Sequence, residues 1–331
     1  MPRNPKLFTT GTLVELTFRT EEGLPFAPNK LIKILVENVL ARAQTMYPLK
    51  IVSYVVMPNH VHILVVVLGP QDVPDFVGYF KRESAYFVNS LLGKIKHTVW
   101  CEGYDSPVIL DPETAIKRLT YINLNPILAI QTKKATNHPL SSAYWVKPDS
   151  ASSEIQVRRI PRNKVPKLPQ RDLTLKDINK AISKLEYRGT EAYTLKVEPN
   201  AWMECFEETA TRRNPKELIE ILDSNINQES LKILKEKEGQ FPTLESLQTQ
   251  NIRKEYQPKK FGKRMLCFGK DKATRLVYLK WFYEYCKNLP SYLKKKDTPH
   301  HRNHYPPGFF APGGFLSANI LRECTPFNTI A

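Results

Sequence analysis

Two histidines in a β-forming stretch could carry metal chemistry in this chain. His60 and His62 are separated only by Val61. In an extended strand alternate side chains share a side, so both imidazoles face one way while Val61 faces the other, into a core. Two imidazoles on one rigid strand can hold a divalent metal ion. An exposed or hydrogen-bonded pair without a metal is the alternative that this spacing leaves open.

Tyr121 and Asn125 form a second candidate pair. They are four residues apart in KRLTYINLNP, so they are neighbours on one face of an expected helix. We expect Pro126 to end this helix and to move Asn125 towards a non-helical conformation. A tyrosine hydroxyl beside an oxygen donor could act as a nucleophile next to a metal. The alternative is that Tyr121 is an ordinary residue of an amphipathic helix.

Hydrophobic periodicity predicts the elements that would position these residues. The order strand–helix–strand–strand–helix–strand is typical of the ferredoxin-like, split βαβ fold. We therefore expect an α+β protein whose antiparallel sheet has helices on one face and leaves the other face free for a ligand. The expected strands are 10–20, 51–57 and 61–67, with a strand or hairpin within 93–110, and the expected helices are 29–47, 72–92 and 111–125.

The charge of the chain favours a polyanionic partner. Its 331 residues are 41% hydrophobic, which supports a packed core, and carry a net charge of +16. Residues 1–150 have a net charge of +4, residues 151–331 one of +12, and Arg253–Arg302 alone +11. Such an excess favours nucleic acid before a membrane. A basic protein that binds no nucleic acid remains the alternative.

The cysteines and the apolar runs indicate the compartment. Five cysteines are scattered without zinc-site or redox spacing, which is typical of reduced thiols in the cytosol. No run approaches the roughly 20 apolar residues of a membrane span. We expect a cytoplasmic protein, associated with the nucleoid, that has no membrane partner.

The second half of the chain differs in composition from the first. Residues 147–170 are polar, basic and rich in Pro and Ser, as in a linker. Residues 171–331 predict a mainly helical, basic region of no recognised family, with helices within 171–196, 214–237 and 273–287. The expected division is therefore a first domain at 1–146, a linker at 147–170 and a C-terminal region at 171–331.

Two motifs carry a family resemblance. MPNHVHIL at Met57–Leu64 and YINLNP at Tyr121–Pro126 resemble the single-tyrosine HUH transposases, and within them the REP-associated tyrosine transposases. The tyrosine lies 59 residues beyond the second histidine, a separation similar to that of the family. The resemblance covers about residues 8–146. One departure is that Ile127–Ile130 replaces a family segment that contains glycine.

The resemblance implies a role for each motif residue. His60 and His62 would ligate a magnesium or manganese ion, with Asn125 as a third ligand. Tyr121 would be the nucleophile that cuts a DNA strand and keeps its 5′ end as a phosphotyrosine. The fold would be the ferredoxin-like one that the element order already predicts.

We therefore expect a metal-dependent DNA transposase that cuts and rejoins single-stranded, hairpin-associated DNA. The alternatives are a DNA-hairpin-binding protein whose cleavage activity is lost or regulatory, and a relaxase or replication initiator of the wider HUH group. The sequence leaves open a monomer or a homodimer. Basic side chains expected to contact DNA phosphates are Lys81, Arg82, Lys259, Lys260, Lys263 and Arg264.

Overall fold

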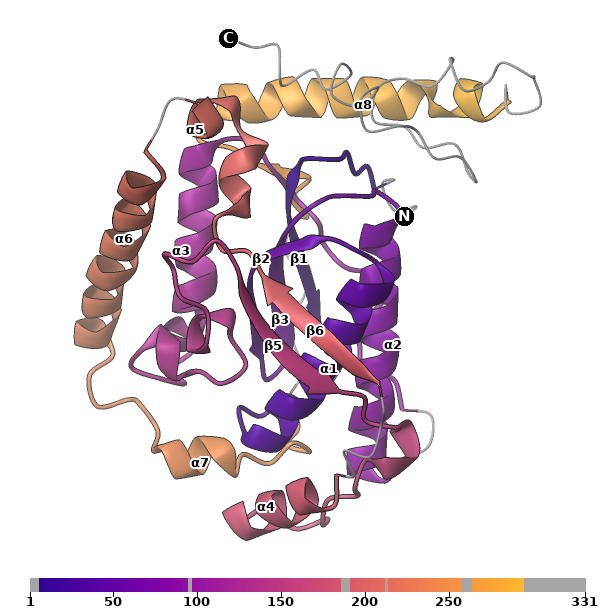
Figure 1. Cartoon of the computed structure of the whole chain (residues 1–331), viewed down its shortest axis with the longest axis vertical. Coiled ribbons are helices and arrows are strands. Elements are labelled where there is room, and N and C mark those ends of the chain that lie inside the picture. Colours follow the sequence, from indigo (N-terminus) through magenta and orange to yellow (C-terminus); the bar gives the residue numbers. More distant parts are fainter. Residues whose placement is uncertain (1–5, 95–96, 186–190, 212–213, 257–263, 295–331) are drawn as a thin grey trace.

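The computed structural model describes residues 6–94, 97–185, 191–211, 214–256 and 264–294 (Figure 1). The strands are β1 (Leu13–Arg19), β2 (Lys50–Met57), β3 (His60–Val66), β4 (Val108–Ile109), β5 (Ser153–Arg158), β6 (Ala192–Val197) and β7 (Cys267–Phe268). The α-helices are α1 (Lys30–Met46), α2 (Asp72–Leu92), α3 (Pro112–Leu128), α4 (Leu175–Ser183), α5 (Glu207–Thr211), α6 (Pro215–Glu236), α7 (Leu244–Gln248) and α8 (Lys272–Lys294). Short 3₁₀ turns are η1 (Ala135–Asn137), η2 (Ser142–Tyr144), η3 (Arg162–Lys164) and η4 (Ala201–Cys205).

One mixed sheet organises the molecule, with the strand order β5-β6-β2-β3-β1-β4-β7. Its centre, β2-β3-β1-β4, is antiparallel throughout and has the strand order of a split βαβ fold. The predicted α+β, ferredoxin-like fold is therefore confirmed. The outer strands β6 and β7 join the centre through parallel pairs with β2 and β4.

The hairpin of β2 and β3 fixes the register of the histidines. Pro58 and Asn59 form its two-residue turn, where a missing backbone donor does not interrupt a ladder. Val61 is fully buried, as expected, and packs on the side of the sheet opposite to the histidines. A buried aliphatic side chain of this kind contributes roughly 1.5–3 kcal/mol, so a one-residue slip of register is costly.

Helices α1 and α2 cover one face of the sheet, and their apolar stripes form the larger core with Val14, Leu16 and Phe18 (Figure 1). The other face is not free, in contrast to the sequence-based expectation. Helix α3 packs on it through Ile116, Leu119 and other apolar side chains, and α6 packs on α3. The apolar residues of β2 and β3 on this face require such a cover, because both sides of these strands are hydrophobic.

The start and the end of α3 decide where Tyr121 and Asn125 lie. Asp111 caps the helix by accepting the backbone N–H of Thr114 at 2.8 Å. The predicted end at Asn125 is wrong, because Pro126 lies inside the helix, which continues to Leu128. The chain leaves the helix through Ile130, whose φ of 57° lies in the left-handed region that favours glycine.

The second half of the chain contributes to the same sheet. The segment 147–170, expected as a linker, contains β5 and η3, and the region expected to be mainly helical also supplies β6 and β7. Gln44 of α1 fastens β6 through two 2.9 Å hydrogen bonds with the backbone of Lys196. Trp202, which is 1% exposed, packs in the core beneath α3. No helix among the described residues is long and apolar enough to cross a membrane.

Candidate functional site

The face of the sheet beneath α3 changes from apolar to polar along β1 and β3. At one end Leu13 pairs with Val66, and at the other Thr17 pairs with His62 and Arg19 with His60. Directly opposed residues of an antiparallel pair point to the same side, so both histidines project from this face. Their ring centroids are 5.1 Å apart and the rings meet edge to face. The predicted common orientation of the two imidazoles is present.

Each imidazole is held through its Nδ1 atom. Nδ1 of His62 lies 2.8 Å from Oε1 of Glu15 and 3.1 Å from the hydroxyl of Thr17. Nδ1 of His60 lies 2.7 Å from Oδ1 of Asn59. A carboxylate or an amide oxygen can only accept, so Nδ1 carries the hydrogen in both rings. In the neutral tautomer this leaves the lone pair on Nε2, the form in which histidine binds a metal.

Glu15 stays ionised although it is 1% exposed. Its Oε2 accepts from Nε of Arg118 at 2.6 Å, and its Oε1 accepts from Nη2 at 2.7 Å. Burial alone would raise the pKa of Glu15, but the hydrogen bonds and charges of His62 and Arg118 lower it to about 2. The imidazole of His62 is thus oriented by a permanent negative charge.

His60 stays neutral at physiological pH. Burial lowers its pKa to about 3, the neighbouring His62 lowers it too, and a hydrogen bond with Asn125 opposes the shift. The neutral imidazole is the form required of a metal ligand. The same hydrogen bond brings Asn125 of α3 to the histidines.

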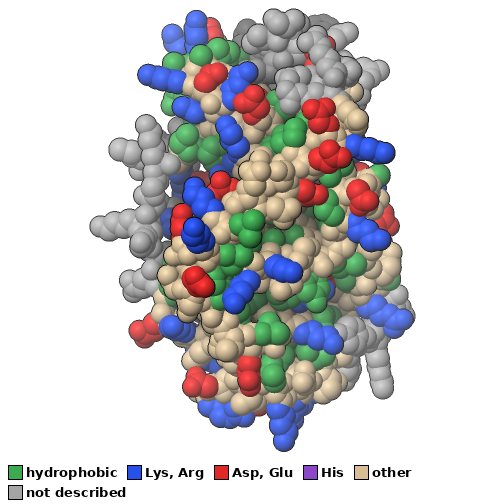
Figure 2. All heavy atoms as spheres, turned by 90° about the vertical axis from the view of Figure 1, so that its left-hand side faces the viewer, with side chains coloured by type: hydrophobic (Ala, Val, Ile, Leu, Met, Phe, Trp, Pro, Cys, Tyr) green, Lys and Arg blue, Asp and Glu red, His purple; other side chains and the backbone are tan. Residues whose placement is uncertain are grey.

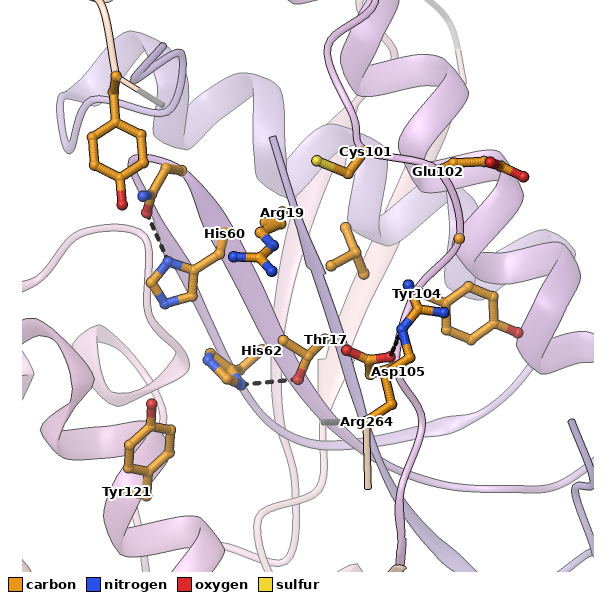
Figure 3. Close-up of a pocket in the computed structure, with 14 residues that line it drawn as sticks. Thr17, Arg19, His60, His62, Cys101, Glu102, Tyr104, Asp105, Tyr121 and Arg264 are labelled. Atoms are coloured by element: carbon orange, nitrogen blue, oxygen red, sulfur yellow. Dashed lines mark hydrogen bonds and ion pairs between the residues drawn. The ribbon is translucent and has the colours of Figure 1, made fainter. Parts of the chain in front are cut away.

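Tyr121 reaches the site from α3. Its ring centroid is 5.5 Å from that of His62, at an interplanar angle of 82°. Its hydroxyl points towards the two histidines (Figure 3). The guanidinium of Arg118, one turn earlier, lies 4.4 Å from the centroid of the Tyr121 ring and limits its rotation. The structure therefore brings Tyr121, His60, His62 and Asn125 together from a hairpin and a helix.

The donor set fits a divalent cation of the kind that the resemblance implies. The two imidazole rings project from one face of the sheet, and the side chain of Asn125, which is 5% exposed, is hydrogen-bonded with His60. Within the described residues no three His, Cys, Asp or Glu side chains gather into a metal-binding group. A metal centre built on both histidines would therefore need a ligand of another kind, such as the amide of Asn125, and imidazole ligands favour the softer manganese over magnesium.

His60, His62 and Tyr121 line a cavity of about 350 Å³, whose lining does not include Asn125. Tyr256 and Arg264 come to its wall from the second half of the chain, and Nε of Arg264 is held 3.2 Å from Oδ1 of Asp105 (Figure 3). Arg19 of β1 also lines it. Two guanidinium groups therefore border the space in front of the histidines, and this group suits the planar, bidentate recognition of carboxylate or phosphate. The remaining lining residues are Thr17, Phe18, Asn59, His60, His62, Cys101, Glu102, Gly103, Tyr104 and Tyr121.

The basic residues expected to bind DNA lie in different surroundings. Lys81 donates to the backbone carbonyls of Cys101 and Gly103, each at 2.8 Å, and so holds the loop that borders the cavity. Arg82 is exposed and lies over the ring of Tyr79. Arg264 lies at the cavity. The other three residues fall outside the described residues: Lys259, Lys260 and Lys263.

The surface that carries α6 does not add a uniform basic face. Figure 2 shows Lys and Arg side chains interspersed with Asp and Glu side chains on this side. Because opposite charges placed close together cancel at a distance, this side of the molecule is not a uniformly positive surface for a phosphate backbone.

Sequence reasoning missed Glu15 and Arg118. Glu15 is the one acidic residue in the strand LVELTFR, and a charge in a strand that is otherwise buried is a signal of a paired group. Arg118 precedes Tyr121 by three residues, a spacing that places both on one helix face. Neither signal identifies the partner, because the contact depends on how α3 docks.

Comparison with known proteins supports the resemblance. Residues 16–124 match the model of the IS200-like transposase family. One similar solved structure is a REP-associated tyrosine transposase bound to a REP hairpin, with 14% identity, covering 43% of this chain and 82% of that chain, at a TM-score of 0.35. Another, described as a transposase from Deinococcus radiodurans R1, has 21% identity and covers 37% of this chain and 95% of that one, at a TM-score of 0.26.

At these TM-scores the two structures carry no argument of their own. None of the curated proteins matches this chain. The family match lies inside the segment for which the motifs predict the resemblance, and it includes Tyr121 and both histidines. The resemblance to the single-tyrosine transposases is thereby confirmed, and residues 16–124 of this chain are similar to the IS200-like transposases, which are enzymes that act on DNA.

Proposed function

We propose that this protein is a transposase that cuts and rejoins single-stranded DNA through Tyr121, next to a metal held by His60, His62 and Asn125. The observation that carries the proposal is the edge-to-face contact of Tyr121 with His62, 5.5 Å between ring centroids, in a segment similar to transposases. A nucleophile and a metal-ligand imidazole in contact favour phosphoryl transfer over a binding role alone.

The bound cation would be magnesium or manganese. It would supply positive charge to the non-bridging oxygens of the scissile phosphate, whose own negative charge otherwise repels a nucleophile. The neutral imidazoles and the amide oxygen would hold it without cancelling its charge. Glu15 accepts a hydrogen bond from Nδ1 of His62, which would leave Nε2 of this ring available to the ion.

The proposed reaction is a transesterification. The Tyr121 oxygen forms a bond to phosphorus while the bond from phosphorus to the 3′ oxygen breaks. The tyrosine proton leaves and the departing 3′ oxygen gains one, so that a free 3′-OH and a 5′-phosphotyrosine result. Because the phosphodiester energy is conserved, a 3′-OH can reverse the step and join DNA without ATP.

The cavity would hold the strand for this step. Arg19 and Arg264 border it, and guanidinium groups bind phosphate oxygens in a bidentate manner. Tyr256, at the same wall, offers a ring on which a base could stack. Such contacts accept a single strand, and a neighbouring hairpin would supply recognition of the site by its shape.

The test uses the full chain with single-stranded hairpin oligonucleotides labelled at the 5′ or the 3′ end, with and without manganese. The expected result is a metal-dependent covalent adduct in which the protein is joined to the 5′ end of the downstream fragment, so that it retains the 3′ label. This adduct is absent from Tyr121→Phe. Binding without an adduct in any hairpin tested would favour the DNA-hairpin-binding protein instead. An adduct that persists in Tyr121→Phe would assign the nucleophile to another residue.

A further inference from the structure

The carboxylate of Glu15 is shared by two elements of the site. It projects from β1 beneath α3 and is 1% exposed. Its Oε1 atom accepts from Nδ1 of His62 on β3 at 2.8 Å and from Nη2 of Arg118 on α3 at 2.7 Å. Its Oε2 atom accepts from Nε of Arg118 at 2.6 Å. One buried group therefore joins the strand of the histidines to the helix of the tyrosine.

The guanidinium of Arg118, held in place by Glu15, in turn restricts the position of the Tyr121 ring. Its edge is fixed by the two hydrogen bonds to Glu15, and planar guanidinium groups accept little distortion of such a fork. Its carbon lies 4.4 Å from the centroid of the Tyr121 ring and 4.6 Å from that of Phe268. Phe268 belongs to β7, so a strand from the second half of the chain closes the stack.

The orientation of the imidazole and that of the phenol thus depend on the same carboxylate. Resting on the function proposed above, we infer that Glu15 and Arg118 are positioning residues that set the nucleophile relative to the metal ligands. Glu15 acts on both groups, because it holds His62 directly and Tyr121 through Arg118. Arg118 contacts the ring of Tyr121 directly and reaches His62 only through the shared carboxylate.

A purely structural buried ion pair is the competing explanation, and the chain contains a matched example. Glu83 of α2 is 4% exposed and pairs with Arg42, at 3.2 Å, and with Arg162. It shares the chemistry of Glu15, a buried carboxylate between arginines. It contacts neither the histidines nor Tyr121 and does not line the cavity. Glu83→Gln therefore serves as the control for the loss of such a pair.

The experiment compares Glu15→Gln, Arg118→Lys and Glu83→Gln in the full chain. The manganese dissociation constant is measured from the spectrum of the free ion by electron paramagnetic resonance, without DNA. The single-turnover rate of adduct formation is measured with a labelled hairpin at saturating manganese. Urea unfolding reports stability in parallel.

Glu15→Gln is expected to weaken manganese binding about 10- to 100-fold, as loss of an outer-shell partner does. It is also expected to slow adduct formation at saturating manganese, by up to roughly 100-fold for a misplaced nucleophile. Arg118→Lys keeps the charge but loses the fork, so it should slow the adduct to a similar extent while manganese affinity stays within about threefold. Glu83→Gln should change neither readout by more than about twofold, although it lowers the urea midpoint.

The inference is overturned if Glu15→Gln lowers only the urea midpoint, as Glu83→Gln does. If Glu15→Gln does not fold, Arg118→Lys decides, and an unchanged adduct rate in that variant overturns the inference. A wild type that binds manganese but forms no adduct refutes the proposed function, while manganese binding by Glu15→Gln still decides the role of Glu15. A wild type that neither binds manganese nor forms an adduct refutes both the proposed function and the positioning role of Glu15.

Discussion

The ring of Tyr121 meets the imidazole of His62 edge to face, with 5.5 Å between the centroids, although the two residues come from elements that are far apart in the sequence. The contact exists because α3 covers the face of the sheet from which the histidines project. The helix that closes the second apolar face of the sheet is therefore the same element that delivers the candidate nucleophile. Packing and proposed chemistry share one interface.

Asn125→Ala is expected to weaken manganese binding, because this amide is the third protein ligand of the proposed metal site. A loss of about tenfold corresponds to about 1.4 kcal/mol, a common value for one lost polar contact. The measurement is a manganese titration of the free protein. Asn123→Ala on the same helix is the control, since its amide donates to the carbonyl of Leu119 and is expected to leave manganese affinity unchanged. Equal losses in the two variants would exclude Asn125 as a ligand.

The hairpin and its histidines could be predicted from the sequence because their causes are local. Pro58 and Asn59 interrupt a β-forming run and so predict the turn. Because side chains alternate between the two faces of a strand, Val61 then points into the core and both histidines point to the opposite side. The side chains of Asn29 and Asp111 cap α1 and α3 through contacts that are local as well, and both helices begin within one residue of the expected starts at 29 and 111. Such features need no knowledge of tertiary contacts.

What the sequence could not predict depends on docking. The role of Glu15 requires Arg118, which lies 103 residues away. Strand β6 pairs with β2 through Ile51 and Val197, which are 146 residues apart, and its short, partly exposed pattern does not reveal that pairing. Pro126 was expected to end α3, but one missing donor near the last turn costs less than the packing that the final turn gains. Tertiary contacts override local preference in each case.

Arg264→Ala is expected to weaken binding of single-stranded DNA whatever its sequence, because the proposed role of this guanidinium at the cavity is a phosphate contact. The slope of log affinity against log salt concentration should fall by about 1. Fluorescence anisotropy over a series of salt concentrations measures both. Arg171→Ala is the control, since this arginine pairs with Asp177 at the start of α4 and lies outside the cavity lining. An unchanged slope in Arg264→Ala would separate Arg264 from the DNA path.

The stability that Glu15 contributes should depend on pH in a defined window. Its pKa falls from an ordinary value of 4.5 to about 2 in the folded protein, so its contribution is complete well above pH 4.5 and is lost as the pH falls towards 2. The difference in unfolding free energy between the wild type and Glu15→Gln should shrink by about 1.4 kcal/mol from pH 7 to pH 3.5. Urea unfolding at both pH values measures this difference. A difference that is independent of pH would mean that the ionised carboxylate is not what stabilises the fold.

Ile130→Gly is expected to stabilise the protein. The φ of Ile130 is 57°, and its neighbour Gln131 donates to the carbonyl of Pro126 at 2.8 Å, as in a left-handed helix end. A β-branched residue costs about 1–2 kcal/mol in this conformation, and glycine removes that cost. Thermal unfolding should show a higher midpoint for Ile130→Gly and a lower one for the control Ala129→Gly, whose φ is −83°. A lower midpoint in both variants would indicate that the side chain of Ile130 stabilises more than its backbone costs.

A fragment of residues 1–146 is expected to be much less stable than the full chain, although the sequence predicts a domain boundary there. Removing the rest deletes β6 from the edge of β2 and takes Trp202 from the core beneath α3. Loss of a fully buried tryptophan side chain alone costs about 3–5 kcal/mol, so Trp202→Ala in the full chain should already lower the urea midpoint clearly. An uncovered strand edge should also make the fragment self-associate, which size-exclusion chromatography detects. A monomeric fragment with an unchanged urea midpoint would establish residues 1–146 as an independent domain, to which β6 and η4 are only added.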